Sequence, residues 1–474
     1  MAHLHKWAFV FIVLSTMLET AVSHQAAAQT EDAKICTEDT GDVAIAACTR
    51  VLKDDPNSAE AYYNRGVVWR HKGNYDNAIG DYSEAIKLNP SYVSAYNNRG
   101  FAWSNKGEYD RAIADFNEAI RLDSQHANSY NNRGNAWASK GDYDKAIADL
   151  DEVIRLNPKF ALGYNNRGNA LSDKGQYEKA IADYNDAISL NPNYAQAYYN
   201  RANAWSAKNN YDAAIADYSE AIRLDPQDAS SYFLLGIVYY KKNEYSEAAK
   251  LFLESGNLKQ DSYAVLWRYL ALSRTKQEAK GELAKNAASL NNKDWAYPII
   301  EFYLDRRTLK ETQSSAVTDG QKCELSYYVA EWHILRSEQD SALKELDVAI
   351  AICPRSFIEY DAAKNERSKI ASVYLDKAKS AENDNRLEDA VKALTRASSI
   401  DPDNKSILEE QIRFSDNLNQ QKFAQLEAAR KAAEERMRLW IYGFGGVLLL
   451  AAGAAAFIFK KKIFAKATPE KVLP

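Results

Sequence analysis

Residues 130–158 read YNNRGNAWASKGDYDKAIADLDEVIRLNP, and residues 164–192 repeat this phrase 34 positions later as YNNRGNALSDKGQYEKAIADYNDAISLNP. The phrase recurs in six consecutive units, which begin at Ala59, Val93, Ala127, Ala161, Ala195 and Ala229. A fixed period of this length is typical of a repeat protein. The 474 residues are therefore divided first by repeats, and the usual domain length of roughly 100–200 residues does not apply.

Within each unit, numbered from position 1 to position 34, the spacing predicts two antiparallel helices. The third unit has Tyr130 at position 4, Gly134 at position 8, Tyr143 at position 17 and Ala146 at position 20, and the other units share the same pattern. Small residues at positions 8 and 20 let the two helices approach closely, and Pro at position 32 of four units ends the second helix. One such hairpin cannot bury its own apolar face, so neighbouring units must stack.

The pattern closely resembles the tetratricopeptide-repeat (TPR) family over six consecutive units. The resemblance implies an all-α fold, a right-handed superhelix of helix-turn-helix repeats with a concave face that binds other proteins. Weaker matches extend the array. The chain is thereby divided into a half-repeat cap at 29–58, six repeats at 59–262, a degenerate helical segment at 263–320, two further TPR-like repeats at 321–404, and a charged helical stalk at 405–438.

The two ends of the chain read as targeting and anchoring segments. Residues 1–28 have a basic start, an apolar run and a small-residue end at Ala26–Ala28, which predicts a signal peptide; the alternative is an uncleaved anchor. Leu439–Phe459 is free of charge and long enough to cross a bilayer. We therefore expect a single-pass protein of a bacterial inner membrane, with its TPR body in the periplasm and residues 460–474 as a cytoplasmic tail. Small residues within Leu439–Phe459 also allow a homodimer.

Four cysteines, Cys36, Cys48, Cys323 and Cys353, suggest disulfides in an exported chain. Three pairings are possible. The repeat phasing favours Cys36–Cys48 and Cys323–Cys353, because each pair lies within one hairpin; four separate thiols are the alternative. No CxxC or paired His supports a metal site.

Positions 7 and 23 carry a charge pattern that is unusual for the family. Position 7 is Arg and position 23 is Asp in the first five units, whereas the sixth unit has Leu235 and Leu251. These positions face each other in an antiparallel hairpin, so the joint replacement predicts internal ion pairs, among them Arg99 with Asp115, Arg133 with Asp149, and Arg167 with Asp183. An arginine row that binds anions is the alternative.

The first helices are rich in Asn at positions that line the concave groove of a TPR array. The candidate partner-binding residues are Asn97, Asn131 and Asn165 at position 5, and Asn135, Asn169 and Asn203 at position 9. An amide both donates and accepts hydrogen bonds, so a row of them suits an extended peptide. The row resembles the asparagine ladder of O-GlcNAc transferase, and it lacks the Lys residues of the carboxylate clamp in chaperone-binding TPRs. The alternative is that these Asn residues are only tolerated polar surface.

Residues 229–370 loosely resemble the bacterial lipoprotein NlpI and its relatives, through Leu266–Leu270, Trp295–Pro298 and Glu331–His333. That resemblance implies an envelope adaptor that scaffolds cell-wall hydrolases and proteases. A lipobox is missing, and Leu439–Phe459 would replace the lipid anchor.

The sequence contains no phosphate loop, nucleophile elbow or dinucleotide fingerprint, so we expect no enzyme activity and no cofactor. The net charge of −5 argues against nucleic-acid binding. The sequence thus predicts a scaffold or adaptor that binds extended segments of other proteins. A self-assembling structural protein and a chaperone-like holder of exported polypeptides are the alternatives.

Overall fold

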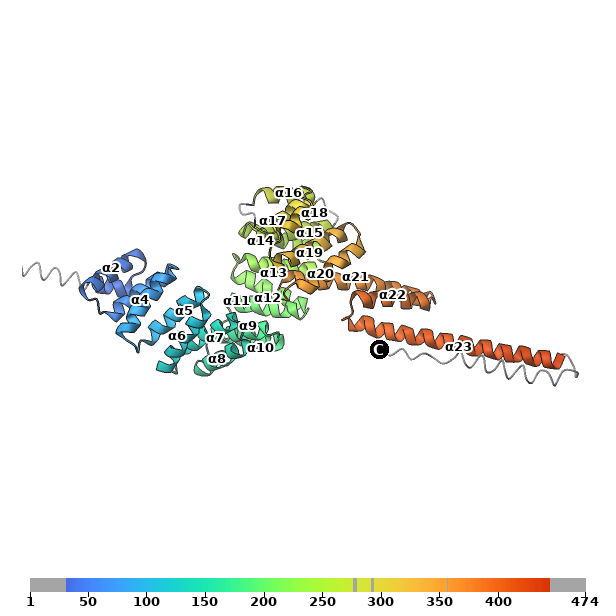
Figure 1. Cartoon of the computed structure of the whole chain (residues 1–474), viewed down its shortest axis with the longest axis horizontal. Coiled ribbons are helices and arrows are strands. Elements are labelled where there is room, and N and C mark those ends of the chain that lie inside the picture. The colour runs from blue at the N-terminus through green and yellow to red at the C-terminus, as the bar shows by residue number, and fades with distance from the viewer. Residues whose placement is uncertain (1–30, 276–278, 291–293, 356, 444–474) are drawn as a thin grey trace, which may run out of the picture. The chain divides into compact units, whose positions relative to one another are not determined.

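The computed structural model describes residues 31–275, 279–290, 294–355 and 357–443, and every regular element among them is a helix (Figure 1). These residues fall into two compact units, divided between Ile300 and Glu301. The predicted signal peptide at residues 1–28 and residues 444–474, which include most of the predicted membrane helix, lie outside the described residues. Among the described residues, no helix has the length and apolar character needed to cross a membrane.

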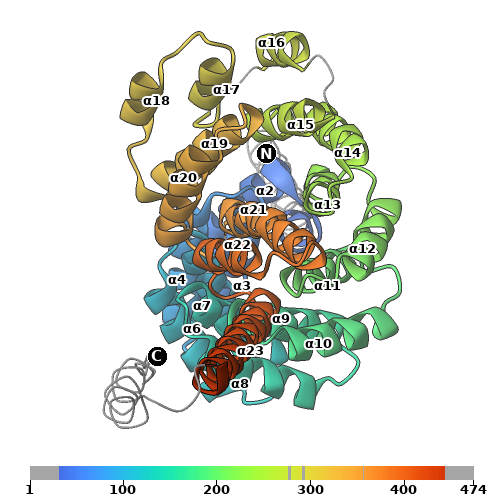
Figure 2. The same ribbon diagram turned by 90° about the vertical axis from the view of Figure 1, so that its right-hand side faces the viewer.

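Unit 1 is built from helix hairpins that repeat every 34 residues. A helical segment at 31–38 and α2 (Gly41–Asp54) precede the six repeats. The first helices are α3 (Ala59–His71), α5 (Val93–Asn105), α7 (Ala127–Ser139), α9 (Ala161–Asp173), α11 (Ala195–Ala207) and α13 (Ala229–Lys241). The second helices are α4 (Tyr75–Leu88), α6 (Tyr109–Leu122), α8 (Tyr143–Leu156), α10 (Tyr177–Leu190), α12 (Tyr211–Leu224) and α14 (Tyr245–Leu258). In Figure 2 the hairpins from α7 to α14 follow a curved path, as a superhelix requires.

The turn inside each hairpin contains one residue in the left-handed backbone conformation, with a positive φ. Gly73, Gly107, Gly141 and Gly175 have φ between 74° and 81° in the first four repeats, and Asn209 and Asn243 take over with φ of 58° and 64° in the last two. Gly, and less often Asn, is the residue that ends a helix in this conformation. The Lys-Gly-Xaa-Tyr phrase therefore encodes a helix stop and, directly after it, the start of the next helix.

Glycine at position 8 serves a second purpose, which is the close approach of the two helices. A Cβ added at Gly168 would lie 2.6 Å from Cε1 of Tyr184, the fully packed position-24 side chain of the same repeat. Gly66, Gly100 and Gly236 meet the rings of Tyr82, Phe116 and Phe252 in the same way. In these four repeats the glycine and the large ring thus form one complementary pair.

Unit 1 continues past the repeats with α15 (Ser262–Arg274), α16 (Lys280–Ala288) and the start of α17 (Tyr297–Tyr303). Unit 2 then contains α18 (Leu309–Ser315), α19 (Asp319–Leu335), α20 (Gln339–Ile352), α21 (Ile358–Asn383), α22 (Leu387–Ile400) and α23 (Lys405–Gly443). Helix α21 is continuous and begins ahead of Ala371, where the sequence period places the start of the last repeat. Helix α23 runs without a break from the predicted stalk to Gly443 and extends past the end of α22 (Figure 1).

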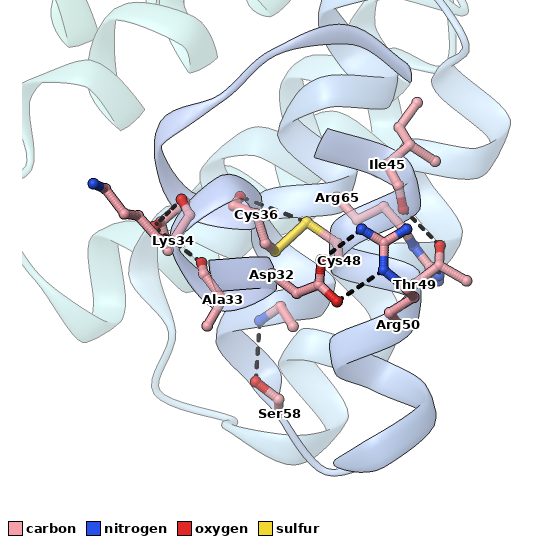
Figure 3. The surroundings of a disulfide bond; sticks show 12 residues. Asp32, Ala33, Lys34, Cys36, Ile45, Cys48, Thr49, Arg50, Ser58 and Arg65 are labelled. Atoms are coloured by element: carbon pink, nitrogen blue, oxygen red, sulfur yellow. Dashed lines mark hydrogen bonds and ion pairs between the residues drawn. A yellow bond between two sulfur atoms is a disulfide. The ribbon is translucent and has the colours of Figure 1, made fainter. Parts of the chain in front are cut away.

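Two disulfides join the cysteine pairs that the repeat phasing favours. Cys36 is bonded to Cys48 across the cap, with a Cα–Cα distance of 4.7 Å, and an ion pair between Asp32 and Arg50 lies beside that bond (Figure 3). Cys323 of α19 is bonded to Cys353, the residue directly after α20, with a Cα–Cα distance of 4.9 Å. Both bonds close a helical hairpin at a point where the regular array begins or resumes.

Candidate functional site

The arginines at position 7 each bind their predicted aspartate with two hydrogen bonds. Arg133 donates from Nε and Nη2 to the two carboxylate oxygens of Asp149, at 2.8 and 2.6 Å. The pairs Arg65–Asp81, Arg99–Asp115, Arg167–Asp183 and Arg201–Asp217 have the same two-bond geometry. The aspartate side chains are 7–9% exposed and the arginines 19–23%, so each charge pair lies mostly within the hairpin.

Each of these arginines also reaches the preceding repeat. Nη1 of Arg133 donates to Oδ1 of Asn117 at 2.6 Å, and its guanidinium carbon lies 5.4 Å from the ring centroid of Tyr130. The corresponding acceptors are Thr49, Ser83, Asp151 and Asn185, all at position 25 of the preceding repeat. The arginines therefore link neighbouring hairpins by hydrogen bonds, and their guanidinium N–H groups bond acceptors within the protein.

Burial and the paired arginine act in opposite directions on the pKa of these aspartates. Burial raises the pKa of Asp115, while the hydrogen bonds from Arg99 act in the opposite direction. The same two causes act on Asp183, whose pKa burial also raises. A partly buried carboxylate keeps its charge here because a guanidinium supplies two charge-assisted hydrogen bonds.

A second row of ion pairs joins neighbouring repeats at their turns, and the sequence prediction missed it. Lys140 at position 14 binds Asp110 at position 18 of the preceding repeat. The other members are Lys72–Asp42, Lys106–Asp76, Lys174–Asp144, Lys208–Glu178 and Lys242–Asp212. The recurrence of Lys and an acid 30 residues apart is the signal that would have revealed them.

The position-5 and position-6 asparagines form one directed relay of hydrogen bonds. Asn166 donates from Nδ2 to Oδ1 of Asn131 at 2.8 Å, and Asn131 in turn donates to Asn132 of its own helix at 3.4 Å. Upstream of these two bonds, Gln196 donates to Asn200, Asn200 to Asn165, and Asn165 to Asn166. Downstream, Asn132 donates to Asn97, Asn97 to Asn98, and Asn98 to the hydroxyl oxygen of Tyr63. The relay crosses from α11 to α3 without changing direction.

The six asparagines predicted to bind a partner therefore lie in different environments. Asn97, Asn131 and Asn165 are buried, with exposures of 8%, 7% and 2%, and their carbonyl oxygens accept from the next repeat. Oδ1 of Asn169 and Asn203 accepts a hydrogen bond from the hydroxyl of Tyr184 and Tyr218. Asn135 is exposed, because its repeat has Leu150 in place of that tyrosine. Of the six, Asn135 is the one that presents its amide most fully to the surface.

Asn135 is one of the residues that line a small pocket formed by α5, α6 and α7. The pocket has a volume of about 160 Å³; Phe101, Tyr109 and Phe116 provide its aromatic lining, and Asn132 and Asn135 are among its polar residues. All of its lining side chains are uncharged; the others are Ser104, Asn105, Ala136 and Ser139. Three aromatic rings beside amide and hydroxyl groups can contact both an apolar side chain and the backbone of a bound segment.

Unit 2 holds a buried cluster of tyrosines and glutamates between α19 and α21. Tyr328 donates from its hydroxyl to Glu359 at 3.1 Å, and Tyr327 donates to Glu331 at 3.0 Å. Burial, with Glu324 nearby, raises the pKa of Glu359 to about 7. Within the described parts of the chain, no group of His, Cys, Asp and Glu could hold a metal ion. The cluster therefore reads as a hydrogen-bonded core, which the repeat period does not reveal.

Comparison with known families identifies the repeats. Tetratricopeptide repeat families match residues 59–92, 93–126, 127–160, 150–182 and 371–404, and a further TPR repeat family matches residues 168–206 and 203–243. These matches cover both the regular array and the last repeat of unit 2.

Individual proteins match this chain only at low sequence identity and over part of its length. The Lipoprotein NlpI homolog of Haemophilus influenzae is 29% identical over 124 residues, which are 24% of this chain and 40% of that protein. A solved tetratricopeptide repeat protein from Parabacteroides merdae is 20% identical, with a TM-score of 0.42, and the match covers 48% of this chain and 91% of that one. MamA from Desulfovibrio magneticus is 24% identical, with a TM-score of 0.33, over 35% of this chain and 95% of its own.

The family matches and the paired helices agree in period and in phase. Such repeats form extended surfaces for binding other proteins. Residues 59–243 and 371–404 are tetratricopeptide repeats, which confirms the predicted family and makes this chain a TPR protein.

Proposed function

We propose that this protein is an adaptor that holds an extended segment of a partner protein along its first helices, anchored by a side chain in the pocket formed by α5, α6 and α7. The pocket carries the proposal. Its aromatic residues suit an apolar side chain, and Asn135, an exposed lining residue, has an amide that can bind the backbone of the same segment. The relay beside it is already satisfied internally, so the surface is preformed.

The experiment compares two exposed positions by photo-crosslinking in cells. A crosslinking residue at Ser139, on the pocket, is matched with one at Arg121, an exposed residue of second helix α6. We expect a discrete partner adduct at Ser139 that Asn135→Lys removes, because a charge would enter a neutral pocket. Equal adducts at both positions would reject the pocket as the site. Adducts only between copies of this chain would favour the self-assembling alternative, and a broad smear of exported polypeptides would favour the chaperone-like holder.

The proposed setting is the bacterial cell envelope, with the TPR body in the periplasm and Leu439–Phe459 in the inner membrane. Two disulfides support an oxidising compartment, since such bonds seldom persist in the cytosol. The resemblance to NlpI suggests proteins of envelope assembly or cell-wall hydrolases as partners. Reporter fusions after residue 58 and after Pro474 test this arrangement: a periplasmic signal from the first and a cytoplasmic signal from the second are expected, and the reverse pattern would overturn it.

A further inference from the structure

The last helix, α23, leaves the body of unit 2 partway along its length. Phe414 is fully buried against α21 and α22, and Lys422 binds Glu388 of α22 at 3.0 Å. From Phe423 to Leu439 every side chain is exposed. Figure 1 shows this part of α23 running on beyond α22. An unpacked stretch of helix has little stability of its own, because most helical stability in proteins comes from packing against other elements.

The exposed part nevertheless carries an apolar stripe. Phe423 and Leu426 are each 70% exposed and Met437 is 47% exposed. Together with Arg430 and Ala433 they recur at intervals of three and four residues, which is the spacing of a coiled-coil seam. In heptad notation Phe423, Arg430 and Met437 occupy a positions, and Leu426 and Ala433 occupy d positions. Large apolar side chains exposed in a row mark an interaction face.

The charges beside the stripe select both the partner and its direction. The e positions, Glu427 and Glu434, are acidic, whereas the g positions are the basic Lys422 and Arg436 and the uncharged Ala429. In a parallel pair of identical helices g faces e of the partner, so Lys422, which also binds Glu388 of α22, lies beside Glu427 of the second copy. An antiparallel pair would bring e against e and g against g, and therefore like charges together. At the e and g positions the charges are therefore complementary in the parallel orientation and not in the antiparallel one.

We propose that residues 422–437 of α23 form a parallel two-stranded coiled coil with the same segment of a second copy of this chain. Arg430 is the single charged side chain in the seam; it bonds Glu434 of its own helix at 3.0 Å. In the parallel pair Arg430 faces Arg430 of the second copy, and a polar residue at one a position fixes the register at a cost in stability. This proposal does not depend on the partner pocket or on the location of the protein.

Cysteine crosslinking of the full chain in detergent tests the seam, because all four native cysteines are in disulfides and an introduced thiol is alone. Leu426→Cys and Ala433→Cys place thiols at d, where a parallel pair brings identical residues together. Ala428→Cys, on the opposite f position of the same helix, is the matched control. We expect disulfide-linked dimers from both d variants and only a background level from Ala428→Cys.

A second variant separates the seam from contacts made elsewhere, such as by Leu439–Phe459. Leu426→Glu in the Ala433→Cys background is expected to lower the dimer fraction to the level of the Ala428→Cys control, while Ala428→Glu in that background leaves it unchanged. Glu at 426 or 428 replaces an exposed residue, so folding is not at stake. Efficient crosslinking at 433 without 426 would overturn the parallel arrangement. Equal crosslinking at 428, absence of dimers, or dimers insensitive to Leu426→Glu would overturn the seam itself.

Discussion

At the scale of single residues, charge burial is what distinguishes this TPR array. A buried ion pair is weak evidence of stability, because desolvation offsets much of the attraction. Here each arginine compensates by binding an aspartate twice, contacting an aromatic ring, and reaching the preceding repeat. The pairs therefore fix the geometry within and between hairpins, and the sixth repeat shows that two leucines can occupy the same two positions.

The pair predicts a specific asymmetry between variants. Arg133→Ala leaves Asp149, which is 7% exposed, without its counter-charge and should lower the free energy of unfolding by about 3 kcal/mol. Arg133→Leu combined with Asp149→Leu reproduces the sixth repeat and should stay within about 1 kcal/mol of the parent. Urea denaturation monitored by circular dichroism measures both. Equal losses in the two variants would show that the charge pair is not the relevant interaction.

Glu359 predicts a dependence of stability on pH. Its pKa in the folded protein is raised to about 7, so the folded state holds a proton that the unfolded state releases near pH 4.3. The free energy of unfolding should therefore fall as pH rises from about 4.5 to about 7, by on the order of 1 kcal/mol per pH unit, and level off above that range. Glu359→Gln replaces the titrating carboxyl with an amide that is neutral at every pH, and it should flatten the dependence of stability on pH. Thermal melts at pH 5 and pH 7.5 compare the two proteins, and an identical pH profile would contradict the assignment.

At the scale of the helices, the directed relay of asparagines changes what a groove-lining position means. The sequence predicts that position 5 faces a partner, and the structure instead uses its carbonyl oxygen to receive the amide of the next first helix. The contact joins residues 35 apart, one more than the repeat length, because positions 5 and 6 of adjacent helices meet on a diagonal. Binding at those positions would therefore compete with the stacking of α5, α7, α9 and α11.

Two asparagines of unit 1 provide a matched comparison. Asn165→Ala removes a side chain that is 2% exposed and leaves the amide of Asn200 without its acceptor, so it should cost about 1–2 kcal/mol of unfolding free energy. Asn135→Ala removes an exposed amide and should change stability by about 0.5 kcal/mol or less. Chemical denaturation of both variants checks the difference. Comparable losses would place Asn135 in the stacking network rather than on the binding surface.

How far the sequence predicts this fold depends on the range of each contact. The 34-residue period locates every helix of residues 59–258, because each boundary is set by a local turn. The arginine–aspartate pairs were predicted because the sixth repeat replaces both partners together. The lysine–acid row was missed although its 30-residue recurrence is present in the sequence. The asparagine relay was not predicted, because it joins residues of different repeats and depends on how adjacent hairpins stack. The cluster around Glu359 was missed because unit 2 departs from the period, with α21 longer than a repeat helix.

At the scale of the whole molecule, the two disulfides lie in different units, one in the cap of unit 1 and the other in the hairpin of α19 and α20 in unit 2. The second closes the longer loop, with a sequence separation of 30 against 12. Longer loops lose more entropy in the unfolded chain when they are closed. Unit 2, whose hairpins are irregular, therefore depends more heavily on its covalent bond.

Removing that bond should affect one unit. Cys323→Ser with Cys353→Ser is expected to destabilise unit 2 by about 3–4 kcal/mol, seen as faster hydrogen exchange in α19 and α20. Peptides from α5 to α12 should exchange as in the parent protein, and they serve as the internal control. Faster exchange throughout the chain would show that the two units unfold as one.

The rows of contacts in unit 1 also restrict how such a chain can change in length. They join residues 16, 30 and 35 apart, and the contacts between neighbouring repeats hold only while each repeat keeps 34 residues. Inserting one residue into a helix would turn the remainder of that helix by about 100° and shift it by about 1.5 Å, so donors would miss their acceptors in every row at once. Adding or removing a complete repeat would leave each remaining donor with an acceptor of the same kind. An array of this kind can therefore be lengthened without loss of these contacts in steps of one complete hairpin.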